Sequence, residues 1–385
     1  MYFLRLSYIS LFSFFIFLSC ASNPYYNWDI IGYTAAAYSY EGVTGPQMSR
    51  EAFLDLRGTV PKTRMAELTT GSSYREIVAQ EPGALEQQLP FYSIRVVYVG
   101  LTWGLGNIVG SFSRATILVS AAAAASIVFM FGLHFLRYQS KLVFVLAPPL
   151  IAFTGARSLG TLSTADGVAA LGAIGLLLAV MNKRWWTSFV LLAAMPFFRT
   201  DFLLLSIVCG AYILLKEKKV QVLAPVLLSI ISYFAINFYF HNYGYLTVFN
   251  FTLISSANPY PASMPISTDW IDYLKAYYHG SGRLVFSTGF YLLAFSGALV
   301  AILNYSTYRS REAESLPEAT MQIGRGGLSD MYLISSLFVF FHFLLFPAAA
   351  WRNYFVAVWV ALAVVLKILD ISLGGRRLIA RPVSR

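Results

Sequence analysis

Asp29 is the first residue of this sequence whose type and position could do chemistry. It follows an apolar segment within Tyr-Tyr-Asn-Trp-Asp-Ile-Ile-Gly-Tyr, residues 25–33. A carboxylate among aromatic side chains at a membrane surface can serve as a general base for a lipid-borne substrate. The alternative role is structural, because an aspartate before an apolar, alanine-rich run also caps a helix, here one running through Ile30 to Tyr40. The two roles are compatible.

Two later turns also carry ionisable residues between apolar segments. Arg199-Thr200-Asp201 puts a cation and a carboxylate at the edge of the hydrocarbon, where such residues are functional candidates. The alternative is a structural ion pair, with Thr200 or Asp201 capping the next helix. Arg157 and Asp166 occupy a similar turn, in which Ser163 or Thr164 is the expected cap.

Arginines at helix starts are candidates for phosphate binding. Arg283 and Arg352 each begin a late apolar segment, and guanidinium is the side chain best suited to phosphate. The alternative is that they extend toward lipid headgroups. The loop before Arg283 carries aromatic and polar residues of the kind found in sugar sites: His241, Tyr243, Asp269, Trp270, Asp272, Tyr273, Tyr277, Tyr278 and His279.

A divalent metal is possible, but no motif requires one. Its ligands would come from Asp29, Asp166, Asp201 or the loop histidines, and the sequence has no HExxH, EF-hand or Cys/His spacing. It also has no P-loop or GxSxG element. The two cysteines, Cys20 and Cys209, lie inside apolar runs, so a thiolate metal site or a disulfide is not expected.

Composition assigns the chain to the membrane. Of 385 residues, 57% are hydrophobic and 12% charged, which is too apolar for a soluble domain of this size. The net charge of +10 comes from small basic groups between apolar segments rather than from one basic face. The expected partners are therefore membrane lipids and not nucleic acid.

The apolar segments predict an all-α fold, a polytopic transmembrane bundle forming one membrane domain over residues 1–385. About 20 residues cross a bilayer as a helix. Segments 142–156 and 185–198 are short and must tilt or extend, so the count of about ten holds within one or two. The predicted helices are 3–20, 113–136, 142–156, 166–182, 185–198, 202–215, 220–240, 284–304, 331–347 and 353–371.

The distribution of basic residues predicts which side each loop faces. With the N-terminus inside, most basic groups fall on the cytoplasmic side, as the positive-inside rule requires, and both termini are cytoplasmic. Residues 1–20 could instead be a cleaved signal peptide, because Arg5 precedes an apolar run that ends in small residues. Either way, the long loops 21–112 and 241–283 lie outside.

The first outer loop is expected to fold as small helices. Ser73-x-x-Glu76 reads as a capping box, and Gly45-Pro46, Pro61 and Pro82-Gly83 as breakers. The stretch at 89–98 leads into an apolar, aromatic run that is expected to lie along the membrane surface. If that run crossed the membrane, most basic clusters would be outside.

Together these features resemble the bacterial GT-C superfamily of integral membrane glycosyltransferases. Asp29 and Tyr33 match the acidic residue and its surroundings in the family's first outer loop. The stretch ending at Arg95 and the turns 163–166 and 199–201 look like elements of family members. Arg352-Asn353-Tyr354 is similar to the arginine-tyrosine pair that opens a late helix and helps to hold the lipid phosphate.

The resemblance implies a multi-pass enzyme of the bacterial inner membrane. Its donor would be a polyprenyl-phosphate-linked sugar, and its acceptor a hydroxyl of a glycan, lipid or protein on the periplasmic face. Asp29 would be the base of an inverting transfer. The implied substrate-binding residues are Arg95, Arg157, Asp166, Arg199, Asp201, Arg283, Arg352 and Tyr354. The sequence departs from many members in lacking a second acid beside Asp29 and a large C-terminal periplasmic domain.

Two other classes of function compete with this interpretation. A transporter or lipid flippase predicts ionisable or helix-breaking residues in the middle of helices, whereas here they gather at the outer ends. The exceptions are His134, His342 and Pro148-Pro149, which are more often packed or kinked helix positions. A non-catalytic assembly or scaffold protein is favoured if the outer arginines and aspartates do not converge on one cavity.

Overall fold

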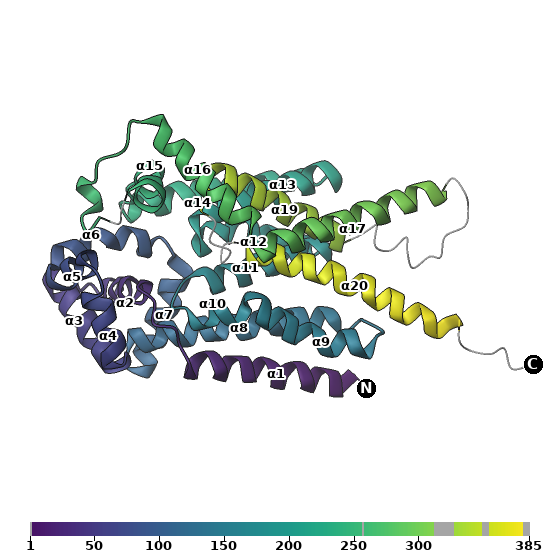
Figure 1. Cartoon of the computed structure of the whole chain (residues 1–385), viewed down its shortest axis with the longest axis horizontal. Coiled ribbons are helices and arrows are strands. Elements are labelled where there is room, and N and C mark those ends of the chain that lie inside the picture. Colours follow the sequence, from purple (N-terminus) through teal and green to yellow (C-terminus); the bar gives the residue numbers. More distant parts are fainter. Residues whose placement is uncertain (1, 256–257, 312–326, 349–353, 380–385) are drawn as a thin grey trace, which may run out of the picture.

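The described part of the chain is entirely helical, as predicted. The computed structural model describes residues 2–255, 258–311, 327–348 and 354–379 (Figure 1). Within these ranges no β-sheet forms, and a single isolated bridge joins Tyr25 to Leu162.

Six helices of the described part are long and apolar enough to cross a membrane, which makes the chain a multi-pass membrane protein. The helices α16 and α17 would add a seventh span if they act as one, although 68° separates them. The six spans are α1 (Tyr2–Ser22), α8 (Phe112–Phe135), α9 to α10 (Lys141–Thr161), η3 to α14 (Val220–Tyr239), α19 (Leu328–Leu345) and Phe355–Leu373 of α20 (Phe355–Ile379).

Each of the ten predicted segments is helical over most of its described residues, but ten spans are not confirmed. α11 (Asp166–Met181), α12 (Trp185–Phe198) and α13 (Leu203–Lys216) have 16, 14 and 14 residues, fewer than the roughly 20 that span a bilayer. The predicted start of the segment 284–304 is wrong, because the chain bends after α16 (Trp270–Val285) and α17 begins at Thr288, running to Arg311.

The third span is interrupted in its outer half. α9 (Lys141–Ile151) contains the Pro148-Pro149 pair and passes into a π-helix, η1 (Ala152–Ala156), before α10 (Arg157–Thr161). Gly155 has φ of 145°, and a Cβ there would lie 2.4 Å from the Phe355 ring. The irregular backbone of this span is therefore at Gly155, and Pro148 and Pro149 lie inside α9.

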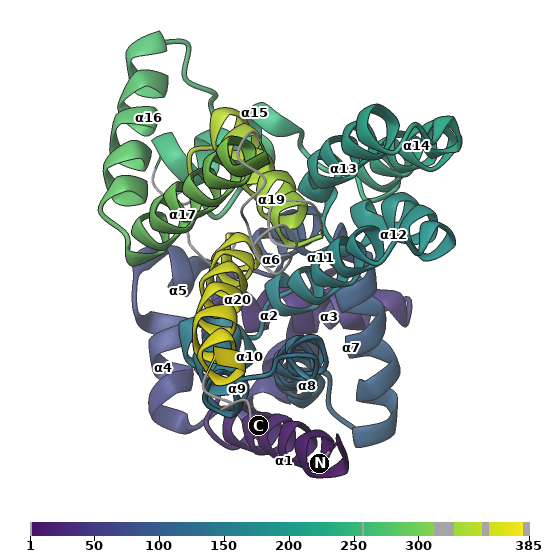
Figure 2. The same ribbon diagram turned by 90° about the vertical axis from the view of Figure 1, so that its right-hand side faces the viewer.

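The first and last helices hold the turn between α8 and α9. Arg5 Nη1 donates to the carbonyls of Leu136 at 3.1 Å and Tyr138 at 2.7 Å. The buried Asp370 of α20 accepts from the Ser140 amide at 2.7 Å. In Figure 1 the start of α1 and the far end of α20 lie at this same end of the bundle, and Figure 2 views the molecule from that side.

The first long loop folds as short helices at the opposite end, as predicted (Figure 1). They are α2 (Asp29–Tyr40), α3 (Gly45–Thr59), α4 (Lys62–Thr70), α5 (Ser73–Gln80), α6 (Pro82–Ser93) and α7 (Val96–Val109). The predicted capping box at Ser73 and Glu76 is wrong, because the N-cap is Ser72, which accepts from the Arg75 amide at 3.3 Å, and Arg75 occupies the position that a capping box gives to Glu or Gln. The apolar run forms α7, which at 14 residues is too short to span a bilayer.

The second long loop packs on the first. It contains α15 (Tyr245–Phe249), η4 (Asn250–Ile254) and η5 (Pro261–Ser263). Tyr243 donates its hydroxyl to the Gln87 carbonyl at 2.8 Å, and the Phe91 and Tyr243 rings lie 5.5 Å apart. The two loops thus form one cap over the same end of the bundle.

Asp55 fixes this cap to the start of α8. Its carboxylate accepts from the Phe112 and Ser113 amides at 2.7 and 3.1 Å and from the Ser111 and Ser113 hydroxyls at 2.5 and 2.7 Å. The first turn of a helix has amides without internal partners and a partial positive charge, so a carboxylate there is stabilising.

We expect Asp55→Asn to lower the free energy of unfolding by about 1.5–3 kcal/mol, because charge-assisted hydrogen bonds are lost. The measurement is thermal unfolding in detergent, followed with a thiol-reactive dye, since Cys20 and Cys209 are both buried until the chain unfolds. Glu51→Gln, on the same helix α3, is the control. Equal effects of the two substitutions would contradict the anchoring role of Asp55.

Candidate functional site

Tyr33 of α2 lies within electrostatic range of four of the candidate residues. Its side chain is buried, and burial raises the pKa of its phenol to about 12. The charges of Arg95 and Arg199 oppose this rise, whereas those of Asp29 and Asp166 add to it. Four candidates from four separate segments therefore act on one side chain at the loop-bearing end.

Asp29 is oriented by its neighbour Asn27. The Asn27 amide donates to Asp29 Oδ2 at 2.8 Å, and its Oδ1 accepts from the Ser163 amide at 3.0 Å. The expected N-cap role of Asp29 is wrong, because Trp28 occupies the N-cap position and Asp29 is the first residue of α2. Its charge nevertheless stands in the first turn, where the helix dipole favours an anion.

Arg199, at the end of α12, forms the centre of a buried ion-pair network. Its Nε and Nη2 donate to Asp201 at 2.9 and 2.8 Å, and its Nη1 contacts Asp166 Oδ1. Asp201 lies in η2 (Thr200–Phe202) and Asp166 begins α11, whose N-cap is Ala165 rather than the expected Ser163 or Thr164. The structural ion pair, one of the two alternatives for Arg199, is present.

His342 of α19 extends this network. Its Nε2 lies 2.9 Å from Asp201 Oδ2 and its Nδ1 lies 3.2 Å from the Tyr354 hydroxyl. Burial raises the pKa of Asp201, but Arg199 and the hydrogen bond with His342 hold it well below its usual range. Asp201 is therefore ionised at neutral pH.

Arg95, unlike Arg199, forms no ion pair with a carboxylate among the described residues. It precedes α7, is half-buried, and donates from Nη1 to the Thr200 hydroxyl at 3.0 Å. Among the described residues no carboxylate lies within ion-pair distance of it. A guanidinium held by one neutral hydroxyl, beside Tyr33, can bind an anionic ligand.

The chain matches no family model, no curated protein and no solved structure. Its function is therefore argued from the chemistry of the side chains described above.

Two predicted site residues, Arg157 and Arg283, are not joined to the network by any contact among the described residues. Arg157 donates from Nε to the Ser19 hydroxyl at 3.4 Å, and Arg283 is exposed on α16. No hydrogen bond or ion pair in the described ranges links either to Arg199. Arg352 lies outside the described residues. In the second loop, Asp269 caps α16 by accepting from the Ile271 amide at 2.9 Å, which is a structural role.

Metal ligands do not gather in the described part of the chain. No group of three His, Cys, Asp or Glu side chains in the described ranges lies close enough together to hold a metal ion. Asp166 and Asp201, two of the three carboxylates considered as ligands, are both bound to Arg199.

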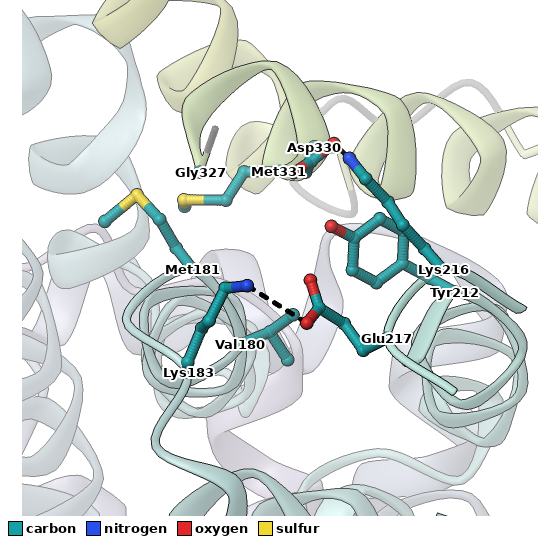
Figure 3. A pocket seen from close by; sticks show the side chains of 9 residues that line it. All are labelled: Val180, Met181, Lys183, Tyr212, Lys216, Glu217, Gly327, Asp330 and Met331. Atoms are coloured by element: carbon teal, nitrogen blue, oxygen red, sulfur yellow. Dashed lines mark hydrogen bonds and ion pairs between the residues drawn. The ribbon is translucent and has the colours of Figure 1, made fainter. Parts of the chain in front are cut away.

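A small cavity of about 150 Å³ lies at the other end of the bundle, between α11, α13 and α19 (Figure 3). Its lysines already have carboxylate partners. Lys183 Nζ lies 3.1 Å from Glu217, and Lys216 pairs with Asp330. The cavity contains none of the predicted site residues, so these pairs connect helix ends rather than extend the candidate site.

Gly32 leaves space for the ring of Tyr92, which packs against Tyr33. A Cβ at this position would lie 2.2–2.4 Å from ring atoms of Tyr92, whose ring is 5.0 Å from that of Tyr33. We expect Gly32→Ala to displace Tyr92 and to cost about 1–3 kcal/mol by overpacking. Thermal unfolding measures this loss.

Gly58→Ala is the matched control, because Gly58 is exposed on α3 and a Cβ added there would meet nothing within 4 Å. That substitution should leave the unfolding temperature unchanged or slightly raised. A Gly32→Ala variant as stable as Gly58→Ala would show that Tyr92 moves aside without cost.

Proposed function

We propose that the chain is a membrane glycosyltransferase in which Asp29 is the general base. The donor is a polyprenyl-phosphate-linked sugar, and the acceptor is a hydroxyl group of a glycan, lipid or protein. The observation that carries the proposal is a set of contacts that bring separate segments together at the loop-bearing end. Asn27 links Asp29 to the Ser163 amide, Arg199 pairs with Asp166, and Arg95 donates to the Thr200 hydroxyl. A base and a cation are thereby held at one end of a membrane bundle.

The proposed reaction is a single inverting displacement. Asp29 accepts the proton of the acceptor hydroxyl as that oxygen attacks the anomeric carbon. The bond from the anomeric carbon to the phosphate oxygen breaks, and its electron pair leaves with the polyprenyl phosphate. Asn27, by its hydrogen bond to Oδ2, orients the base for this transfer.

The phosphate released in this step needs a positioned cation. Arg199 is a weaker choice than the sequence implies, because Asp166 and Asp201 already bind its guanidinium. Arg95, held only by Thr200 among the described side chains, is the better candidate. Arg352 remains predicted for the same role from the arginine-tyrosine pair, and Tyr354 already contacts His342.

The orientation follows from the distribution of basic residues. Arg5, Lys141, Lys183 and Lys216 lie at the end opposite the candidate site, and positive residues favour the cytoplasm. We therefore assign the loop-bearing end to the periplasmic face of a bacterial inner membrane, with both termini in the cytoplasm.

A transporter or lipid flippase is the second candidate. The observation that favours it is the buried contact between His342, which is 4% exposed within an apolar helix, and Asp201. Buried ionisable networks of this kind occur in proton-coupled transport. A non-catalytic assembly protein is the third candidate, because Arg157 and Arg283 are not joined to the Arg199 network by any contact among the described residues.

Transfer from defined donors distinguishes these functions. Membranes containing the chain are given polyprenyl-phosphate sugars labelled in the sugar, and labelled products are separated from donor. We expect label to move onto an acceptor only when the chain is present. Label that crosses vesicles on an unchanged donor would instead establish transport, and the absence of transfer from every hexose and pentose donor would reject the proposal.

A further inference from the structure

Helix α16 carries an apolar stripe that is exposed in the described structure. Trp270, Leu274 and Tyr278 are 68%, 54% and 78% exposed, and Ile271 and Val285 are also exposed. Residues four apart lie on the same side of a helix, so the first three form one line and the other two widen it. Large apolar side chains arranged in this way indicate a contact surface.

The opposite side of α16 is fixed to the protein. Tyr277 donates its hydroxyl to the Leu344 carbonyl at 2.5 Å, and Asn250 donates to the Tyr273 hydroxyl at 3.1 Å. Gly280 is buried so tightly that a Cβ would lie 2.3 Å from the Pro347 carbonyl oxygen. Packing therefore fixes the rotation of α16 and turns the stripe outward, at the edge of the molecule in Figure 2.

Basic residues border the stripe. Lys275, His279 and Arg283 are all exposed, and at 3.6 residues per turn they lie between the stripe and the packed side. The acid nearest to them in sequence, Asp272, is 3.7 Å from Lys275. An apolar stripe with a basic margin is typical of helices that lie in the interface of an anionic membrane.

The angle between α16 and α17 fits a helix on the membrane surface. The chain bends by 68° between them, and residues 288–302 of α17 complete the apolar pair. If α17 crosses the bilayer at a right angle, α16 lies about 22° from the membrane plane, given that bend. Its four ionisable residues, Asp272, Lys275, His279 and Arg283, disfavour a place in the hydrocarbon.

We infer that α16 is an interfacial helix whose stripe lies in the phospholipid headgroup layer at the loop-bearing end. Lys275, His279 and Arg283 then face lipid phosphates. This inference does not depend on glycosyl transfer. The contacts of Tyr277 and Gly280 with Leu344 and Pro347 join the helix to the end of α19, so the membrane surface also positions the segment that carries His342.

Site-specific fluorescence in vesicles tests this inference. The full chain with Leu274→Cys is labelled with an environment-sensitive dye and reconstituted into phosphatidylcholine–phosphatidylglycerol vesicles. Cys20 and Cys209 are fully buried, so the new thiol reacts selectively. His279→Cys, on the basic margin, is the matched control, and Tyr278→Cys repeats the stripe measurement if Leu274→Cys fails to insert.

We expect the dye at 274 to emit at shorter wavelength and to be quenched about threefold more strongly than at 279 by a nitroxide near the lipid headgroup, as for an interfacial helix. Aqueous iodide should quench position 279 more. Equal iodide quenching at 274 and 279 would overturn the inference. Stronger quenching at 274 by a nitroxide at the centre of the bilayer would also overturn it, in favour of a broken span.

Discussion

Asp29→Asn is expected to abolish sugar transfer, with a loss of about 10²–10⁴-fold, the usual contribution of a general base. The amide cannot accept the proton of the acceptor hydroxyl, although it keeps the size of the carboxylate. Because Asp29 is half-buried at the start of α2, thermal unfolding should change little. The measurement is initial rate of label transfer at matched protein levels.

Glu41→Gln is the control for this substitution, since Glu41 is an exposed acid just after the other end of α2. It should transfer label at the wild-type rate. An Asp29→Asn variant with the wild-type unfolding temperature and the wild-type rate of transfer would eliminate Asp29 as the base. That result would favour the transporter or lipid flippase.

Arg199→Met is expected to cause the largest loss of stability. It leaves Asp166 and Asp201 without their shared cation in a site where Arg199 is only 8% exposed. Breaking a buried ion pair by removing one partner costs about 3–5 kcal/mol. Thermal unfolding, followed by exposure of the Cys20 and Cys209 thiols, measures the loss.

Two comparisons make this prediction specific. Lys216→Gln removes the partner of Asp330 at the other end of the bundle, where the lysine is 52% exposed, and exposed pairs contribute only about 0–1 kcal/mol. Adding Asp166→Asn and Asp201→Asn to Arg199→Met should restore part of the stability, because no uncompensated carboxylate remains. An Arg199→Met variant no less stable than Lys216→Gln would refute the role of the network.

Hydropathy predicted the positions of the helices well. It predicted less well which of these helices cross the membrane. Each predicted segment is helical over most of its described residues, because apolar runs of this length favour helix in any apolar environment. Whether α11, α12 and α13 cross alone depends on tilt and on neighbouring helices, which composition does not encode. The bend before Thr288 is likewise a tertiary feature, since nothing in the apolar run itself specifies its angle.

The site could be predicted in part because ionisable residues at the ends of apolar segments are costly unless they have partners. That rule found Asp29, Asp166, Arg199 and Asp201, and it offered the Arg199–Asp201 ion pair as one alternative, but it did not identify Asp166 as the second partner of Arg199. The sequence favours a packed helix position for His342, because its partner, Asp201, is 141 residues away. The only signal of a site is an ionisable side chain within an apolar segment.

The bond from Asp370 to the Ser140 amide has a consequence for biogenesis. The two residues are 230 positions apart, and at about 5–20 residues per second a ribosome needs roughly 10–50 s to make the intervening chain. The helices α8 and α9 are therefore synthesised early, and the hydrogen bond between Asp370 and the Ser140 amide can form only after α20 has been synthesised. Until then the turn between α8 and α9 has the hydrogen bonds from Arg5 but not the one to Asp370.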